Sequence, residues 1–524
     1  MDKKSKLAGR KSGDLSAVDR DLSLPASVAP AEGIELVFGL VGPTGVDLTM
    51  VCNALHASLT NVRYEPFVVD LSELIPKIAK PNKFTPINDY YRIKSLMKMG
   101  TKLRERTGQA DIVARLGIAE IRALREAQSN DPLKPISRAA YVVRSFKRPE
   151  EVDLYRTIYG KAFTLISVYS PRDARVKHMR RRFSQITDVK RTADELAVEL
   201  INRDYAEEGG KKYGQNVSET FPLADYFLTT DSRTDVEENV RRLIHLIFGD
   251  PYISPTRDEQ GMFFAQASAL RSLDLSRQVG AAIISKDGDL LSTGCNEVPK
   301  YGGGLYWGED TYRKRDVELG HDANVAIKRE IVEDAFSYLR AAGWLSEAAK
   351  EKTNSLLANE SLFDGRAFLR SSKLFDVIEF GRAVHAEMAA ITQAAKNGIS
   401  LSGNKLFCTT FPCHICARHI VSSGLSEVVF IEPYEKSRTK DLYDDSIAVE
   451  SPEPSITKSN FRAFVGVAPR RYMTWFKMAS DRKDKMGNTL DLSKFAKKPR
   501  VKRYVLTYLA LEDIIIKETI MPAK

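Results

Sequence analysis

The sequence predicts an α/β protein built from two successive parts. Between residues 34 and 249, apolar runs of strand length alternate with helical patterns, which favours a parallel sheet. After residue 250 a helix, a β-hairpin and further helices follow one another. At 524 residues the chain is too long for one ordinary domain. We therefore divide it into a tail at 1–30, an N-terminal part at 31–250 and a C-terminal part at 251–524, which contains a long insertion at about 300–380 and ends in a C-terminal extension.

The composition, 43% hydrophobic and 28% charged residues, is typical of a globular protein with a sizeable core. No apolar run approaches membrane-spanning length and the N-terminus lacks the apolar core of a secretory signal, so we expect a cytoplasmic protein with no membrane partner. The five cysteines form no disulfide framework. The net charge of +10 is spread along the chain, with local basic runs at 3–11, 175–182 and 494–503. Such runs suit a phosphate-bearing substrate or an anionic polymer, although a solvated helix face explains most of them.

The N-terminal part opens with a candidate phosphate loop. A flexible tail at 1–30 precedes a strand expected at 34–41, and a helix is expected at 48–59. The turn between strand and helix consists of Gly42, Pro43, Thr44, Gly45, Val46 and Asp47. Where a Walker A loop places its lysine and its serine or threonine, this chain has Val46 and Asp47, so the ammonium and the magnesium-binding hydroxyl are missing. Backbone N–H groups alone can still bind phosphate, so these six residues are candidate nucleotide-binding residues.

The following segments continue the alternation. Helices are expected at 89–102, 109–128, from 148 onward and at 236–248, and strands at 139–144, 163–169 and 224–228. This order resembles the P-loop nucleoside-monophosphate kinases over roughly 34–249, including the Arg-Pro-Glu-Glu helix start at 148–151 and the Ala-Asp-Tyr-Phe strand at 224–227. Arg144 stands where such a kinase often has an acidic residue. The resemblance therefore implies nucleotide or effector sensing, or a purely structural role, rather than phosphoryl transfer.

The strongest chemical signal lies in the C-terminal part. A His-Ala-Glu motif at 385–387 and a Pro-Cys-His-Ile-Cys motif at 412–416 form the pattern of zinc-dependent nucleobase deaminases. His385, Cys413 and Cys416 would give zinc (Zn²⁺) three protein ligands and leave a fourth position for a water, whose pKa the metal lowers. Glu387 is not needed as a ligand and can carry protons as the catalytic general acid and base. Pro412 is expected in the first turn of a helix, which places both thiols near that helix's N-terminus.

Two other interpretations of the cysteine pair compete with catalysis. Cys-x-x-Cys alone also fits a redox pair or half of a structural zinc site. No second pair of cysteines completes a closed four-ligand site, however, and both motifs open apolar helical runs. We therefore favour an open, catalytic zinc site.

The segments before these motifs extend the pattern. S-x-D-x-x-x-Q-V-G-A at 272–281, T-G-x-N-x-x-P at 293–299, H-A-E and F-P-C-x-x-C follow the order of the deoxycytidylate deaminases, which this part resembles. The resemblance implies a cytidine-deaminase-like α/β/α sandwich, with Asn296 contacting the sugar hydroxyl and Arg277 as a phosphate ligand. Asn296 also fits a plain turn residue. Ser276 and Ala389 stand where the family often has Arg and Asn, which leaves the preferred number of phosphates open.

Together the two parts resemble the bacterial anti-phage deoxycytidine-nucleotide deaminases. The resemblance implies deamination of dCTP and dCMP, depletion of dCTP as an antiviral defence, and assembly into homo-oligomers, commonly hexamers. Candidate partners are a nucleotide effector at the N-terminal part, an inhibitory RNA and a phage trigger. The alternative is a deaminase of single-stranded DNA or RNA, which needs a basic groove with interleaved aromatic residues. The sequence features that favour this alternative are the basic run at 494–503 and scattered tyrosines.

The connection from Asn296 to His385 is unusually long, with helices expected at 323–341 and 346–357. We interpret it as a lid or an oligomer contact beside the pocket, because loops of this length are usually functional. Beyond the cysteine motif, a strand is expected at 427–431, subunit packing is assigned to 461–478, and a last strand is expected at 504–511.

Overall fold

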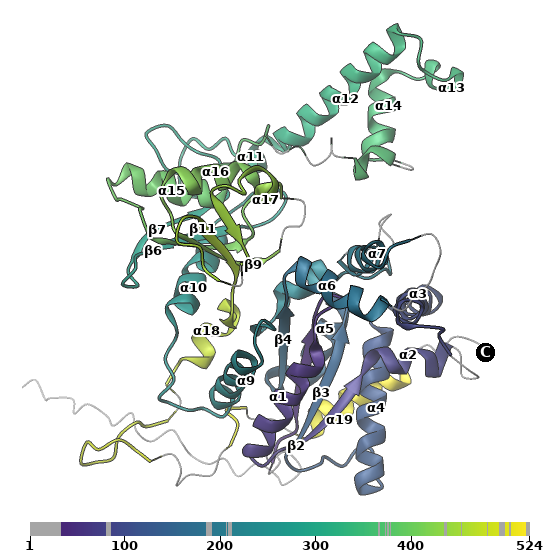
Figure 1. Cartoon of the computed structure of the whole chain (residues 1–524), viewed down its shortest axis with the longest axis vertical. Helices are drawn as coiled ribbons and strands as arrows, with labels where there is room; N and C mark the ends of the chain where they lie inside the picture. The colour runs from purple at the N-terminus through teal and green to yellow at the C-terminus, as the bar shows by residue number, and fades with distance from the viewer. Residues whose placement is uncertain are drawn as a thin grey trace, which may run out of the picture.

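The computed structural model describes residues 33–519 except for short gaps. These gaps are residues 80–84, 185–190, 206, 208–211, 365–366, 373, 375–376, 378, 434–436, 452, 479, 492–497 and 502–504. The expected tail at 1–30 lies outside the described residues, as does most of the basic run at 494–503. The described part contains two six-stranded sheets flanked by helices, which confirms the α/β class (Figure 1).

The first sheet is parallel except at one edge. Its strands are β1 (Leu36–Val41), β2 (Glu65–Asp70), β3 (Ala139–Phe146), β4 (Phe163–Tyr169), β5 (Tyr226–Thr229) and β12 (Gly466–Val467). The spatial order is β12-β5-β4-β1-β3-β2, and β12 alone runs antiparallel to its neighbour. β1 lies in the middle and all six of its residues are buried, as expected for a parallel strand covered on both faces. The edge strand β2 was not predicted from the sequence.

Helices cover both faces of this sheet. They are α1 (Leu48–Asn61), α2 (Leu71–Ala79), α3 (Asp89–Thr107), α4 (Ile112–Ser129), α5 (Pro149–Tyr159), α6 (Arg172–Phe183), α7 (Ala193–Tyr205), α8 (Val217–Thr220) and α9 (Arg233–Ile247), with 3₁₀ turns η1 (Gly160–Ala162) and η2 (Phe221–Leu223). Alternate residues of β1 separate the two layers: Phe38 and Leu40 pack with α1 and α9, whereas Val37 and Val41 pack with α2, α4 and α5.

The second sheet belongs to the C-terminal part. Its strands are β6 (Gly280–Ile284), β7 (Leu290–Cys295), β8 (Lys405–Thr410), β9 (Glu427–Glu432), β10 (Ile447–Val449) and β11 (Ser459–Ala463), in the order β10-β11-β9-β8-β6-β7. β6 is antiparallel to β7 and to β8, and the remaining pairs are parallel. α10 (Arg257–Ala269) packs against the sheet from one side, and α15 (Ala386–Lys396) with α16 (His414–Ser422) lies on the other. α17 (Thr439–Leu442) follows β9.

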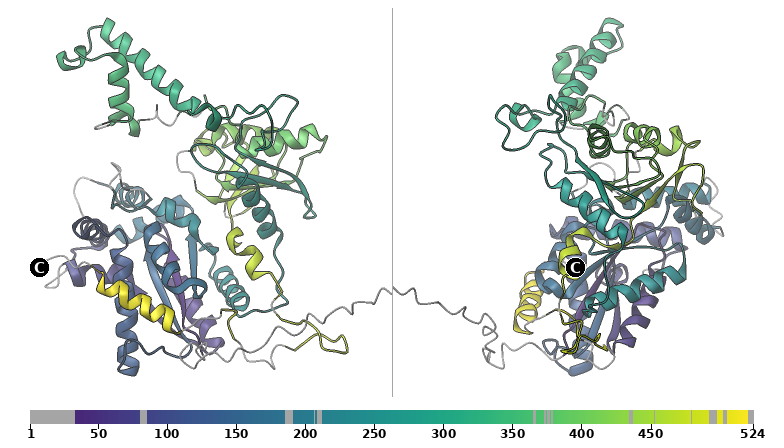
Figure 2. Two further views of the ribbon diagram at one scale, coloured as in Figure 1. Left: turned by 180° about the vertical axis from the view of Figure 1, so that it is seen from behind. Right: turned by 90° about the vertical axis from the view of Figure 1, so that its left-hand side faces the viewer.

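The insertion forms an arm that projects away from both sheets (Figures 1 and 2). It contains α11 (Asp316–Leu319), α12 (Ala323–Ala341), α13 (Glu347–Lys350), α14 (Asn354–Leu362) and the 3₁₀ turn η3 (Phe368–Ser371). The helix expected at 346–357 is therefore two shorter ones. Only Lys328 and Val332 of α12 are buried, and Trp344 between α12 and α13 is 79% exposed. Among the described residues of the arm, those that line the pocket described below are Asp316, Asp322 and Asn324 at its base.

The C-terminal extension returns to the first sheet. α18 (Pro469–Trp475) follows β12, and α19 (Val505–Lys517) packs against α4 and α5. The strand expected at 504–511 is wrong, because 505–517 is helical and the helix places Glu512 against the buried Arg125. The segment at 461–478, assigned to subunit packing, packs within the chain through β11, β12 and α18.

The two sheets share one apolar core. The rings of Tyr169 on β4 and Phe430 on β9 meet edge to face at 6.4 Å, and Phe227 on β5 meets Phe464 at 5.8 Å. We find no helix with the length and apolarity to cross a membrane in the part of the chain that the structure describes.

Candidate functional site

The N-terminus of α15 is fixed against β7 by a glycine. A Cβ on Gly294 would lie 2.2 Å from the carbonyl oxygen of Ala386 and 2.4 Å from the nitrogen of Ala390, so only glycine permits this approach. The hydroxyl of Ser292 donates to the carbonyl of Ala390 at 2.8 Å and ties the same two elements together. His385 is the N-cap residue of α15, and Glu387 lies in its first turn.

α16 presents the two thiols in the same way. Cys413 is its N-cap residue and Cys416 lies in its first turn, as the spacing predicted. Pro412 was expected inside the first turn but lies just before the N-cap, where its carbonyl accepts a hydrogen bond of 3.1 Å from the Thr439 hydroxyl. The positive ends of two helix dipoles therefore lie at one point, which favours thiolates there.

The predicted metal ligands converge. The Nδ1 atom of His385 lies 3.3 Å from the Cys413 sulfur and 3.4 Å from the Cys416 sulfur, and the three ligand atoms lie within 4.8 Å of one another. Tetrahedral zinc with bonds near 2.1 Å to nitrogen and 2.3 Å to sulfur would separate these atoms by roughly 3.6 Å. Neither cysteine is in a disulfide. The donor set thus fits zinc and leaves one coordination position for a non-protein ligand.

The electrostatics of the cluster suit both metal binding and proton transfer. Hydrogen bonding from Cys416, together with the His385 imidazole, lowers the pKa of the Cys413 thiol to about 4. Burial raises the pKa of the Glu387 carboxyl, whose residue is only 4% exposed. A buried carboxyl whose pKa is raised holds its proton more strongly than one in water, which suits a proton carrier beside a metal site.

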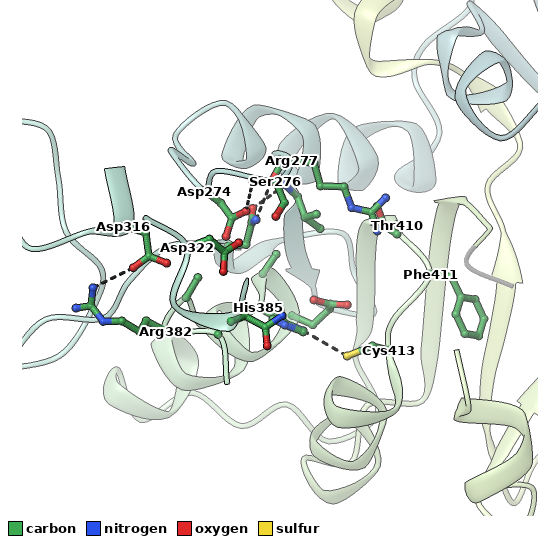
Figure 3. Close-up of a pocket in the computed structure, with 17 residues that line it drawn as sticks. Asp274, Ser276, Arg277, Asp316, Asp322, Arg382, His385, Thr410, Phe411 and Cys413 are labelled. Carbon is green, nitrogen blue, oxygen red and sulfur yellow. Dashed lines mark hydrogen bonds and ion pairs between the residues drawn. The ribbon is translucent and has the colours of Figure 1, made fainter. Parts of the chain in front are cut away.

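A cavity of about 220 Å³ opens beside the cluster (Figure 3). Its wall includes His385, Glu387 and Cys413, and it brings the predicted residues Asn296 and Arg277 to the same space. Asp274, the acid of the motif at 272–281, lines it too, and so do three side chains that the sequence did not point to, namely Asp316, Asp322 and Arg382. Two of these acids come from the base of the arm, more than sixty residues before the histidine, so no local pattern could reveal them.

Asn296 holds one wall of the cavity. Its Oδ1 accepts a hydrogen bond from the Val279 nitrogen at 2.7 Å, and its Nδ2 donates to the Arg277 carbonyl at 2.8 Å. The residue is 8% exposed. One lone pair and one N–H of the amide remain beyond these two bonds, so a ligand hydroxyl could still bind.

Two arginines stand at the cavity, each beside an acid of the chain. Arg277 lies 2.9 Å from a carboxylate oxygen of Glu432, and its side chain is 47% exposed. Arg382 lies 2.9 Å from a carboxylate oxygen of Asp316 at the base of the arm. Figure 3 shows the Arg382–Asp316 pair on the side of the cavity away from Cys413.

The candidate phosphate loop does not reach this cavity. Residues 42–47 follow β1 in the first sheet and line a second cavity of about 620 Å³. There the Thr44 nitrogen donates to a carboxylate oxygen of Asp204 at 2.6 Å, and Asp47 caps α1.

Comparison with known proteins identifies the region around the cluster. Residues 255–432 match the family described as "Cytidine and deoxycytidylate deaminase zinc-binding region". The C-terminal part therefore carries a cytidine and deoxycytidylate deaminase zinc-binding region, and the metal that its cluster takes is zinc.

Three relatives are similar over short stretches. The deoxycytidylate deaminase of Enterobacteria phage T2 is 36% identical over 87 residues, which are 16% of this chain and 45% of that protein. That of phage T4 is 42% identical over 55 residues (10% and 28%), and a probable deoxycytidylate deaminase of Drosophila melanogaster is 37% identical over 75 residues (14% and 36%). The chain thus spans less than half the length of each of these relatives.

Solved structures are similar at a lower level. The dCMP deaminase from the cyanophage S-TIM5, in complex with dCMP and dUMP, is 17% identical with a TM-score of 0.23, covering 41% of this chain and 100% of that one. A shikimate kinase from Acinetobacter baumannii is 11% identical with a TM-score of 0.22, covering 42% and 96%. At these scores neither likeness bears on the function.

Proposed function

We propose that the chain is a zinc-dependent enzyme that hydrolyses deoxycytidine nucleotides, dCTP, dCMP or both, to deoxyuridine nucleotides and ammonia. The observation that carries this proposal is the His385, Cys413 and Cys416 cluster beside the buried Glu387 in one cavity. The match of 255–432 to the deaminase zinc region, and the similarity to deoxycytidylate deaminases of a phage and a fly, support a cytosine nucleotide as substrate.

In this mechanism His385, Cys413 and Cys416 hold the metal. Zinc bound there would supply a Lewis acid that lowers the pKa of a water in its open position. The Glu387 carboxylate accepts a proton from the attacking water and delivers it to N3 of the cytosine ring as the C4–O bond forms. Glu387 then takes the remaining proton from the hydroxyl added at C4 and passes it to the exocyclic amine, so that the C4 carbonyl forms as the C4–N bond breaks and ammonia leaves. The pKa of Glu387, raised by burial, matches a group that alternately holds and gives up a proton.

The cavity suits a free nucleotide. Asn296 offers its remaining amide capacity to a sugar hydroxyl, and Arg277, which lines the same cavity with its side chain 47% exposed, serves as the phosphate ligand. Arg382 is a second phosphate ligand if the phosphate displaces Asp316 from it.

The biological setting is proposed from the family resemblance alone. We place the enzyme in the cytoplasm as a homo-oligomer that lowers dCTP during phage infection. A nucleotide effector, an inhibitory RNA or a phage product would control it.

Product analysis tests the activity. The purified chain is incubated with dCTP, dCMP, CTP, cytidine and a cytosine-containing single-stranded oligonucleotide, with zinc content measured alongside. We expect deoxyuridine nucleotide from dCTP or dCMP, and a rate loss of at least about 100-fold in Glu387→Ala with zinc content unchanged. Activity that survives this substitution contradicts the mechanism, and faster deamination of the oligonucleotide favours the polynucleotide alternative.

A further inference from the structure

The arm contributes a buried hydrogen-bond acceptor to the cavity beside His385, Cys413 and Cys416, called the zinc cavity below. Asn324 lies in the first turn of α12 and lines this cavity. Its Nδ2 donates to the Val377 carbonyl at 3.2 Å, which fixes the orientation of the amide, since the opposite orientation would bring two oxygens together. Its Oδ1 is buried and has no hydrogen-bond partner among the described residues. A buried acceptor left unpaired at a cavity wall indicates that the ligand supplies the donor.

The arm meets the zinc cavity at the end away from the cysteine ligands. Figure 3 shows Asp316 and Asp322, both at the base of the arm, on the side of the cavity away from Cys413. Asn324 follows Asp322 by two residues and enters from the same base. In the proposed reaction, C4 of cytosine and its exocyclic amine must reach the metal and Glu387. The arm end of the cavity is therefore left for the sugar and the phosphate.

The sugar is the part of the substrate that can satisfy Asn324. Ionised phosphate oxygens accept hydrogen bonds, so they suit Arg277 and Arg382 but not another oxygen. In a 5′-phosphorylated 2′-deoxynucleotide, the 3′-hydroxyl is the remaining hydroxyl of the sugar, and its O–H donates. Asn296 still has an N–H beyond its two bonds, so it can donate to the oxygen of this hydroxyl while Asn324 accepts its proton.

We propose that Asn324 accepts a hydrogen bond from the 3′-hydroxyl of the substrate, so that the zinc cavity selects cytosine nucleotides whose 3′-oxygen carries a proton. This inference rests on the proposed deaminase function and narrows its substrate class. A cytosine inside a DNA strand has its 3′-oxygen esterified to the next phosphate and cannot donate there. The arm therefore favours free deoxynucleotides over internal positions of DNA.

Steady-state kinetics of the full chain with zinc bound test the proposal. Whichever of dCTP and dCMP is turned over faster is compared with its 2′,3′-dideoxy analogue. For the wild type, kcat/KM should fall at least roughly tenfold when the hydroxyl is removed, because the buried acceptor is then left unpaired. In Asn324→Ala the ratio of the two kcat/KM values should shrink to roughly threefold or less, because the acceptor itself is gone.

Asn354→Ala is the matched control. Asn354 also begins a helix of the arm, and its Oδ1 accepts from Arg340 at 3.1 Å, but it is not among the described residues that line the zinc cavity. Its loss weakens the contact between α14 and α12 without removing a group from the cavity, so the ratio should stay that of the wild type. A ratio that shrinks as much in Asn354→Ala as in Asn324→Ala assigns the effect to a loosened arm and overturns the role of Asn324.

The other outcomes also separate the two proposals. A wild type that turns over the dideoxy analogue as well as the natural nucleotide overturns the inference, and so does an Asn324→Ala variant that keeps the wild-type ratio. A wild type that is inactive on both dCTP and dCMP contradicts the proposed function itself, and the inference falls with it. Asn324→Ser, a second truncation, takes the place of Asn324→Ala in the comparison if the melting curve shows that the alanine variant does not fold.

Discussion

The buried ion cluster under α19 gives a sharp stability prediction. Arg125 donates to Glu35 at 3.0 Å through both Nε and Nη2, and Nη2 also donates to Glu512 at 3.0 Å. All three side chains are 0% exposed. Arg125→Met would leave two buried carboxylates without their guanidinium, although the hydroxyls of Tyr141 and Tyr508 still donate to Glu35.

The expected loss of stability is about 3–5 kcal/mol, the usual cost of removing one partner from a buried pair. One helical turn earlier, Arg122 pairs with Asp513 at 3.2 Å, but these side chains are 16% and 30% exposed. Arg122→Met is therefore the matched control, and should cost no more than about 1 kcal/mol. Replacing Arg125, Glu35 and Glu512 together by apolar residues of similar volume should restore most of the loss.

Denaturation followed by far-UV circular dichroism at several pH values is the assay. Burial by itself would raise the pKa of Glu35, but the charge and hydrogen bonds of Arg125 lower it by more. The pKa of Glu35 is therefore lowered in the folded chain. Its stabilising contribution is therefore present above the unfolded pKa near 4.5 and is lost as the pH falls through the folded value. The difference in free energy of unfolding between wild type and Arg125→Met should therefore become smaller at acidic pH. Equal losses for Arg125→Met and Arg122→Met at neutral pH would refute the reasoning.

Three further predictions concern the zinc region and the contact between the sheets. Gly294→Ala should lower the free energy of unfolding by about 1–3 kcal/mol and weaken zinc binding, because the new Cβ meets Ala386. Melting curves and metal-content measurements check both effects. Gly308→Ala is the control and should change neither stability nor zinc content, because a Cβ there has nothing within 4 Å. Cys413→Ser should bind zinc at least about 100-fold more weakly than the wild type in competition with a chelator. Atomic absorption after dialysis against the chelator measures the zinc that remains bound. Equal retention by the two proteins would contradict the role of Cys413 as a ligand. Glu450 directly follows β10 and accepts a hydrogen bond from the hydroxyl of Tyr169 on β4, at the contact between the two sheets. Burial raises the pKa of Glu450 to about 8, so folding stability falls as the pH rises from the unfolded value near 4.5 through about 8. Glu450→Gln should therefore gain stability over wild type at about pH 9 relative to about pH 5, and a pH-independent difference in melting temperature would contradict this.

Local sequence signals predicted the elements that depend on local chemistry. The strands at 163–169 and 427–431 and the convergence of His385 with Cys413 and Cys416 were predictable, because apolar runs and ligand spacing are properties of short segments. Contacts between residues far apart in the sequence could not be predicted. Asp204 contacts Thr44 across 160 residues, and no pattern in either segment indicates this contact.

The strand predicted at 504–511 is a helix in the structure, and this error also arises because long-range contacts decide the conformation. The apolar run at 504–511 is compatible with strand or helix, because a short continuous apolar segment lacks a diagnostic period. Tertiary packing decides here, since a helix can place Tyr508 and Glu512 on the face that meets Glu35 and Arg125.

The pairing of β12 with β5 has a consequence for how the chain is made. Because Gly466 is translated long after Phe227, the growing polypeptide has one edge of its first sheet without its antiparallel partner until residue 466 has been made. Unpaired strand edges attract foreign strands, so nascent chains of this protein should need protection by chaperones until then. A product cut short by a premature stop codon would keep that border open permanently and would be a target for cellular quality control.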